Sequence, residues 1–525
     1  MKKSSIIIIF ILGFLYALPA YNKFWFPFDE GITLVCADMI SHGAIPYKDF
    51  ITIYGPTQLY ALAFLFKVFG PNTVLAHLYI ITLHAIITTI IFYFAFKLSK
   101  DKWISLFVWL VGLSCFAPRM GPSASSMWPF MVSASLSMLF FIWFLEKKAA
   151  RNLIIAGIFA SIGFLGRFEM GLYFIACEIF IIIAYGLFRH FLPYIISVSV
   201  LPAAFVLYLT REEALGNLWQ CMKVPYETTI RFAQTSFPLP CLDLRQVFYG
   251  SLFFIQVNQH YIPVLTYLVV AVCLAYYGFR RSIGRTEAAI LLFIALTGTA
   301  MFPYAYFGAD AGHTMPVIFP ALMLSGYILA EGMKSGAGSR AFKIFIRAAA
   351  ILLAFLMVLL FIKNTDKYLK NAFVKPFKKD IVYMATPRGS SYVPRDEVQK
   401  FKDAMDFLNK NSVPGENIFV GFDAHNDVFQ GGEPMLYFLS GHPPASKHFI
   451  MLPGTVNTEK VQREIIESLK NTRIVMLTQE GKIISEAGKN EEGSTVLDEY
   501  IKKNYKFYIK TGKYNIYIKK SLSED

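Results

Sequence analysis

Charged side chains are scarce in this sequence. Only 16% of its 525 residues are Asp, Glu, Lys or Arg, whereas ordinary soluble domains carry about 25%. The shortage coincides with long apolar runs, and the mean hydropathy is +0.47. Many of these runs reach the roughly 17–25 residues that cross a bilayer as a helix. The composition therefore excludes a soluble protein and predicts a polytopic membrane protein.

The sequence also lacks the short motifs that mark common cofactor sites. Its six cysteines include no CxxC pair of the zinc type, and there is no glycine-rich phosphate loop, internal repeat or low-complexity tract. Cys115, Cys177 and Cys273 fall inside or at the ends of apolar segments, which is typical of small core residues. Cys221 and Cys241 share one predicted loop, and the sequence allows either a disulfide between them or two free thiols.

The net charge is strongly positive, at +14. Such an excess suits nucleic acid when the basic residues form one patch. Here they occur instead in short clusters between apolar segments, which is the pattern of cytoplasmic loops beside membrane spans. We therefore expect membrane lipid as a partner and no nucleic acid.

About eleven apolar segments are candidate membrane spans. If the N-terminus is cytoplasmic, every even-numbered loop is cytoplasmic too, and those loops hold the basic clusters, for example at residues 97–102 and 280–285. The first segment resembles a signal peptide, but its poor cleavage site predicts an uncleaved helix. This pattern predicts a multi-pass protein of the plasma (inner) membrane. The segments lie near residues 4–20, 73–97, 102–117, 126–145, 151–166, 168–187, 191–209, 261–279, 286–303, 314–332 and 343–362.

The chain changes character after the last apolar segment. Residues 394–411 combine alternating charge with an apolar face of period 3.6, which predicts a soluble helix. Residues 417–423 and 472–478 are typical of buried strands, and residues 505–520 predict a hairpin that turns at Thr511-Gly512.

These patterns predict two domains. Residues 1–365 would form the membrane domain, with a first outer loop over residues 21–72. Residues 385–525 would form an extracytoplasmic α/β domain, because an odd number of spans separates them from a cytoplasmic N-terminus.

Two carboxylates follow the first apolar segment almost at once. Asp29 and Glu30 precede a stretch whose apolar residues fall on one helical face, which predicts a short helix on the membrane surface. At its N-terminus, Asp29 would cap the unpaired amides, point into a cleft as an ionised base, or do both. Two turns follow, one at Pro46-Tyr47-Lys48-Asp49 and one at Tyr54-Gly55-Pro56.

More polar groups fall in other loops on the same predicted face. Arg167 and Glu169 stand between two apolar segments with almost no loop, so they form either a structural pair or a functional site. Asp310 and His313 are three residues apart, which makes His313 either an anion donor or an exposed side chain beside a capping Asp310. Arg119 would anchor at the interface or join the site.

A family resemblance rests on residues 29–70. The Asp29-Glu30 pair, the Pro46-Tyr47-x-Asp49 turn, the following proline and a helix ending at Phe69-Gly70 resemble the first outer loop of GT-C-fold glycosyltransferases. The group in question is the protein-O-mannosyltransferase and aminoarabinose-transferase-like superfamily. The topology and the tail extend the likeness along the chain in outline.

The resemblance implies a GT-C-like fold and a glycosyltransferase. Its donor would be a polyprenyl-phosphate-linked sugar, and its acceptor an envelope glycan, lipid or protein. Asp29 matches the expected base of an inverting transfer, and Glu30 would support it or orient the acceptor. Substrate binding is expected from Tyr47, Lys48, Asp49, Tyr54, Arg119, Arg167, Glu169, Asp310 and His313.

The chain departs from the aminoarabinose transferases at one point. They carry a lysine before a Pro-Pro pair in the first loop, where this chain has Tyr54-Gly55-Pro56, and Lys48 lies earlier. No cofactor is predicted, and assistance by a divalent cation stays open. The alternatives are a transporter or flippase for lipid-linked or small solutes, and a non-catalytic envelope protein with a partner-binding outer domain. The absence of paired repeats and the clustering of ionisable residues at one membrane face favour the transferase.

Overall fold

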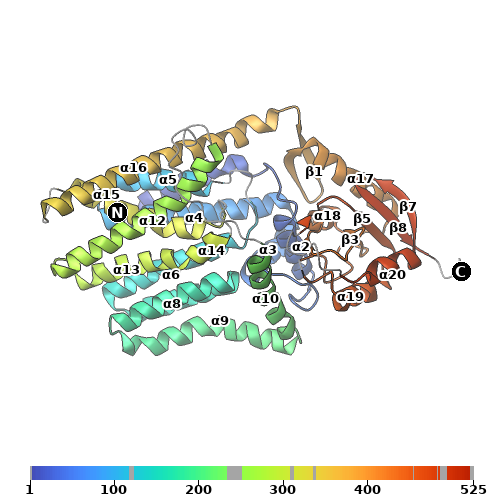
Figure 1. The fold of residues 1–525 in the computed structure, drawn as a ribbon, viewed down its shortest axis with the longest axis horizontal. Coiled ribbons are helices and arrows are strands. Elements are labelled where there is room, and N and C mark those ends of the chain that lie inside the picture. Colours follow the sequence, from blue (N-terminus) through green and yellow to red (C-terminus); the bar gives the residue numbers. More distant parts are fainter. Residues whose placement is uncertain are drawn as a thin grey trace.

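The structure of the protein is a computed structural model. It describes residues 3–117, 123–232, 251–307, 312–334, 339–452, 454–481, 483–484 and 493–520, with only the backbone at 224–232, 251–259, 307, 430 and 483–484. A bundle of long helices forms one end of the molecule, and a mixed α/β part forms the other (Figure 1).

Every apolar segment expected to span the membrane contains a helix. Eight helical stretches are long and apolar enough to cross a membrane, and α5 and α7 are shorter apolar helices. The polytopic helical class is therefore confirmed, with fewer full-length spans among the described residues than the eleven expected. The helices are α1 (Lys3–Ala17), α4 (Thr73–Ser99), α5 (Lys102–Phe116), α6 (Met127–Lys147), α7 (Ala150–Gly166), α8 (Phe168–Ala184), α9 (Phe191–Arg211), α12 (Ser251–Phe279), α13 (Arg285–Ala300), α15 (Met315–Met333) and α16 (Arg340–Leu369).

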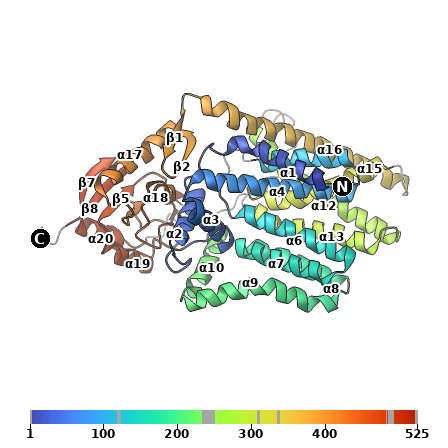
Figure 2. The same ribbon diagram turned by 180° about the vertical axis from the view of Figure 1, so that it is seen from behind.

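The connections alternate between the two ends of the bundle. At one end the basic loops come together, where Lys97 Nζ lies 2.6 Å from Glu146 Oε1 and Arg285 Nη2 donates to the carbonyl of Tyr185. The other end carries α2 (Asp29–Ser41) and α3 (Pro56–Phe69), which lie between the bundle and the α/β part (Figures 1 and 2). We call it the α2 end.

The first-loop helix was expected on the membrane surface, and its position is more enclosed. α2 does begin at Asp29, but every residue from Glu30 to Ala37 is buried. An added Cβ on Gly31 would lie 2.5 Å from the amide nitrogen of Met435, in α18 (Pro434–Ser440). The glycine therefore permits α2 to pack directly against the C-terminal part, so α2 is covered on both sides.

The C-terminal part contains the helix and strands that the sequence predicted. Its four-stranded sheet has the order β3-β5-β8-β7, in which only β3 and β5 pair in parallel. The hairpin turns at Gly512-Lys513, because Thr511 still pairs with Tyr514 and Gly512 takes the positive φ of 55°. The elements are β1 (Ile381–Thr386), β2 (Gly389–Pro394), α17 (Arg395–Asn411), β3 (Phe419–Phe422), β4 (Phe429–Gln430), α19 (Glu459–Leu469), β5 (Ile474–Thr478), β6 (Ile483–Ile484), α20 (Val496–Asn504), β7 (Tyr505–Thr511) and β8 (Tyr514–Lys519).

The β1–β2 hairpin ties this part to the bundle. The carbonyl of Arg388 accepts from the amide of Thr73, where α4 begins, and Tyr392 exchanges backbone hydrogen bonds with Asn22 and Phe24. Core side chains of the first loop, the bundle and the C-terminal part belong to one continuous hydrophobic cluster. The division into domains at residues 365 and 385 stays a prediction, and α16 itself continues to Leu369.

Candidate active site

Asp29 is held at the α2 end by a tyrosine from the next turn of the first loop. It is the first residue of α2, and the N-cap position before it belongs to Phe28. Its side chain is exposed, and Tyr54 donates its hydroxyl to Asp29 Oδ1 over 3.3 Å. Burial, together with the nearby Asp29 charge, raises the pKa of Tyr54 above its ordinary value. The phenol therefore stays protonated and donates to the carboxylate.

The Tyr54 turn lies directly on the end of α7. An added Cβ on Gly55 would lie 2.1 Å from the carbonyl oxygen of Leu165, so only glycine permits this approach. Tyr47 donates its hydroxyl to the carbonyl of Tyr54 over 2.8 Å and fixes the turn from the other side. This packing places Tyr54 beside Arg167, which follows α7 immediately.

Groups from three other segments orient the Arg167 guanidinium. Nη2 donates to the hydroxyl of Tyr304 over 2.8 Å, and Nη1 donates to Ser126 Oγ over 3.4 Å. Nε lies 3.1 Å from Glu169 Oε1, in an ion pair where the Arg167 side chain is 15% exposed and that of Glu169 is 49% exposed. Arg167 is thus a nearly buried cation whose carboxylate partner reaches solvent.

Tyr304 connects Arg167 to His313. It lies in the short helix α14 (Phe302–Phe307), and its ring centroid is 4.7 Å from that of His313. Both rings are partly exposed. Sequence reasoning missed Tyr304, because an aromatic residue beside an apolar segment is also typical of a membrane-interface anchor.

Glu30 lies away from this exposed cluster. Its side chain is fully buried, and Oε1 lies 2.6 Å from Nε2 of His77, which is also fully buried. The other ring nitrogen, Nδ1, lies 2.6 Å from the carbonyl oxygen of Tyr21. Both ring nitrogens of His77 therefore contact an oxygen atom. Glu30 Oε2 also accepts from the amide of Phe26, so these contacts fix the start of α2.

The other first-loop residues hold the loop itself. Lys48 pairs with Glu212 beside the end of α9 at 3.3 Å, and Asp49 accepts from the amide of Ile45 at 2.7 Å. The structure thus brings Asp29, Tyr54, Arg167, Glu169 and His313 into one region and places Tyr47, Lys48 and Asp49 in the supporting loop.

Some predicted positions cannot be placed. Arg119, Asp310 and Cys241 lie outside the described residues, whereas Cys221 is described and buried. Within the described part of the chain, no group of three His, Cys, Asp or Glu side chains could hold a metal ion.

The site combines a carboxylate with cationic and hydroxyl groups. A carboxylate such as Asp29 can accept a proton, while a guanidinium held like that of Arg167 can bind an oxyanion through two parallel hydrogen bonds. The arrangement suits a reaction in which a hydroxyl loses a proton and a phosphate-like group gains negative charge.

Comparisons with known proteins give one family model and similar solved structures. Residues 54–208 match the family described as dolichyl-phosphate-mannose-protein mannosyltransferase. The crystal structure of ArnT from Cupriavidus metallidurans bound to undecaprenyl phosphate is 13% identical, with a TM-score of 0.52 over 99% of each chain. The apo form of that protein is 12% identical, with a TM-score of 0.51 over 98% of each chain. No curated protein matches by sequence. At these identities, the likeness to the solved structures is one of fold.

Proposed function

Because the chain has the GT-C fold of integral membrane glycosyltransferases, we propose that it transfers a sugar from a polyprenyl-phosphate-linked donor to a hydroxyl of a cell-envelope acceptor. The GT-C fold expected from the first loop is confirmed, and the family model that matches residues 54–208 supports the expected superfamily. The undecaprenyl phosphate bound to ArnT supports a lipid carrier of this kind here.

The observation that carries the proposal is the separation of charge at the α2 end. Tyr54 contacts the exposed Asp29 and also lies close to Arg167 and Tyr304, which form a cationic and hydroxyl cluster with His313. Arg167, Tyr304 and His313 lie where bundle helices begin or end, and Asp29 begins α2 at the same end of the bundle. A donor with its polyprenyl chain in the bilayer would present its phosphate and sugar at this depth.

The transfer is a single displacement in this scheme. Asp29 accepts the proton of the acceptor hydroxyl, whose oxygen attacks the anomeric carbon of the donor sugar. The bond between that carbon and the phosphate oxygen breaks, and its electron pair leaves with the polyprenyl phosphate. Arg167 stabilises this charge, helped by Tyr304 and His313. The configuration at the anomeric carbon inverts, because attack and departure occur on opposite faces.

The supporting residues follow from the same scheme. Tyr54 orients Asp29 by donating a hydrogen bond, and Glu30 with His77 anchors the helix that carries the base. Glu169 neutralises Arg167 before the donor binds. Since its side chain reaches solvent, a donor phosphate could replace it at Arg167 without disturbing the core.

The test is the variant Asp29→Asn in full-length protein in detergent. Asparagine keeps the shape of the side chain but cannot take the proton, so release of polyprenyl phosphate should fall about 10²- to 10⁴-fold. Binding of the polyprenyl-phosphate sugar should persist. Release is measured with a panel of polyprenyl-phosphate sugars and envelope acceptors.

Asp49→Asn is the matched control. It alters a carboxylate in the same loop but leaves an oxygen to accept from Ile45, so turnover should stay near that of the wild type. If Asp29→Asn works at the wild-type rate, Asp29 is not the base. If the wild type releases no polyprenyl phosphate with any pair of substrates, the transferase proposal itself fails.

A further inference from the structure

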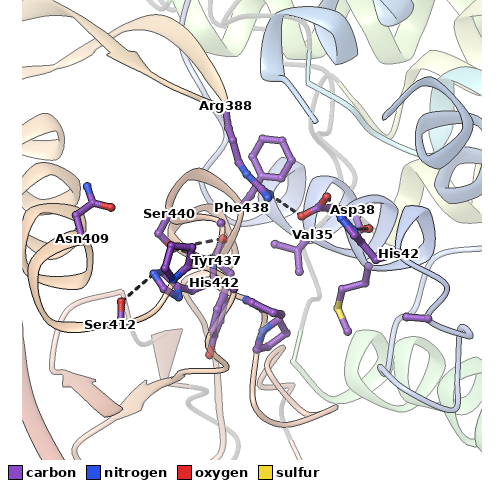
Figure 3. A pocket seen from close by; sticks show the side chains of 17 residues that line it. Val35, Asp38, His42, Arg388, Asn409, Ser412, Tyr437, Phe438, Ser440 and His442 are labelled. Carbon is purple, nitrogen blue, oxygen red and sulfur yellow. Dashed lines mark hydrogen bonds and ion pairs between the residues drawn. The ribbon is translucent and has the colours of Figure 1, made fainter. Parts of the chain in front are cut away.

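A second candidate site lies between α2 and the C-terminal part. It is a cavity of about 650 Å³, within the range of about 300–1,000 Å³ typical of small-molecule sites. Figure 3 shows Asp38 and His42 projecting from α2 on one side, and Asn409 and Ser412 at the end of α17 on the other. Arg388, from the turn between β1 and β2, lies over it beside Phe438.

This cavity is separate from the candidate active site. Asp38 follows Asp29 by nine residues of the same helix, which places it about 14 Å along the axis and about half a turn around it. Asp29 faces the Tyr54 turn, whereas Asp38 faces Arg388. The body of α2 therefore lies between the two.

The charges in the cavity balance each other. Arg388 Nη1 lies 2.5 Å from Asp38 Oδ2. Arg388 Nε and Nη2 face Gly441, where an added Cβ would lie 3.3 Å from both atoms. Asp38 Oδ1 accepts no hydrogen bond from any described residue, although His42 Nδ1 lies 3.5 Å away. A free phosphate or carboxylate would meet the Asp38 carboxylate here, so an anionic ligand is disfavoured.

The remaining lining combines polar side chains with apolar surfaces. His42 is 70% exposed, Asn409 is exposed, and Ser440 adds a hydroxyl. Pro414, Pro443 and Pro444 supply flat apolar patches. Sugar hydroxyls both donate and accept hydrogen bonds, and the C–H faces of a sugar ring pack on apolar side chains. A peptide helix would instead need a continuous apolar groove.

We propose that this cavity binds a neutral saccharide. Resting on the proposed function, the saccharide would be part of a glycan acceptor remote from the reacting hydroxyl. Because α2 carries Asp29 at one end and lines this cavity near the other, an acceptor held here would be anchored to the helix that carries the base. The cavity would thus help select an acceptor longer than one sugar.

The test measures binding without any donor. Purified full-length protein is applied to an array of neutral, amino and anionic oligosaccharides, with inorganic phosphate as a competitor. The wild type and Asp29→Asn should bind the same neutral oligosaccharide. The double variant His42→Ala with Asn409→Ala should bind at least about tenfold more weakly, as expected for the loss of one or two hydrogen bonds.

Two further variants distinguish a specific loss of binding at the cavity from a general loss of folding. Asn409→Trp fills the cavity from an exposed position and should abolish binding, and Lys410→Ala, at the neighbouring exposed position on α17, should leave it unchanged. Thermal unfolding shows whether each variant is folded. Binding that persists in folded cavity variants, or that is lost in Asp29→Asn, would overturn the proposal.

Other results on the oligosaccharide array also test the proposed neutral-saccharide site. A wild type that binds no saccharide, or binds anionic ones that phosphate displaces, contradicts a neutral-saccharide site. Since no transfer is measured, these results stand whether or not the enzyme assay succeeds.

Discussion

Arg167 shows how a single side chain can be prepared for an anion. A guanidinium presents its donors in a rigid plane, and here Tyr304, Ser126 and Glu169 each contact a different nitrogen of that plane. Fixing the plane before a substrate arrives removes the entropy cost of ordering it during the reaction. Two of these partners are uncharged, and the side chain of the third, Glu169, reaches solvent, so an anionic group can take its place at Arg167.

Removal of this guanidinium should slow transfer. We expect Arg167→Ala to lower turnover by roughly 10- to 10³-fold, as for the loss of one donor to a developing oxyanion. Arg167→Lys should recover only part of that loss, since an ammonium cannot reproduce two parallel hydrogen bonds. The rate of polyprenyl phosphate release measures the turnover of both variants. Arg463→Ala, in an exposed pair on α19, serves as the control, and equal rates in all four proteins would leave Arg167 as a structural anchor.

We expect Glu30 to act through packing rather than on substrate. The pair of Glu30 with His77 is fully buried, and removing one partner of a buried pair costs about 3–5 kcal/mol. Glu30→Gln should therefore lower the stability to unfolding in detergent. Lys48→Ala, which breaks the more exposed pair with Glu212, should cost less than about 1 kcal/mol. A Glu30→Gln protein with wild-type stability and no turnover would instead place Glu30 at the substrate.

At the scale of elements, the site depends on how the first loop meets the end of α7. Gly55 makes this contact closer than a side chain allows, and Thr57 adds a hydrogen bond of 2.8 Å to the carbonyl of Ile162. The loop bearing Tyr54 and the turn bearing Arg167 are therefore positioned together. A shift of the loop would separate the base from the cationic cluster.

The contact between Gly55 and the end of α7 can be tested by adding one methyl group, in the variant Gly55→Ala. In Gly55→Ala the new Cβ meets backbone carbonyls, which cannot move aside as a flexible side chain would. A displacement of about 1 Å in an active site can cost about 10² in rate, so we expect a loss of that size in turnover with retained membrane insertion. Gly216→Ala, where an added Cβ has no atom within 4 Å, should be neutral. Full activity in Gly55→Ala would show that the loop position is not critical.

At the scale of the whole molecule, the C-terminal part lies against the same end of the bundle as α2 and α3 (Figures 1 and 2). Arg388 pairs with Asp38, and the ring centroids of Phe66 and Phe438 are 5.7 Å apart. Both parts must then lie on one side of the membrane. The basic loops gather at the opposite end, and the distribution of lysine and arginine predicts that this end is cytoplasmic.

This orientation predicts the behaviour of two fusions. A reporter at the C-terminus should be active only outside the cytoplasm, and one inserted after Lys334, between α15 and α16, should be active only inside. Enzymatic reporters that work on one side of the membrane provide the measurement. A cytoplasmic C-terminus would contradict both the span count and the placement of the candidate active site.

The sequence predicted most of the elements, because their signals are local. A helix in lipid satisfies its own backbone hydrogen bonds, so a long apolar run is sufficient to indicate it. The amphipathic period of α17 and the apolar strands β3 and β5 are likewise contained within each segment. The hairpin turn was predicted one residue early, since either neighbour of Gly512 could close it.

For the candidate site, the sequence by itself determined the ionisable groups that stand at the ends of apolar segments, among them Asp29, Arg167 and His313. Only the tertiary structure decided how they are used. It buries Glu30 against His77, 47 residues away, and it brings Tyr304 to Arg167 across 137 residues. No local pattern specifies such contacts, because they depend on the packing of helices whose order in space the hydropathy of each segment does not contain.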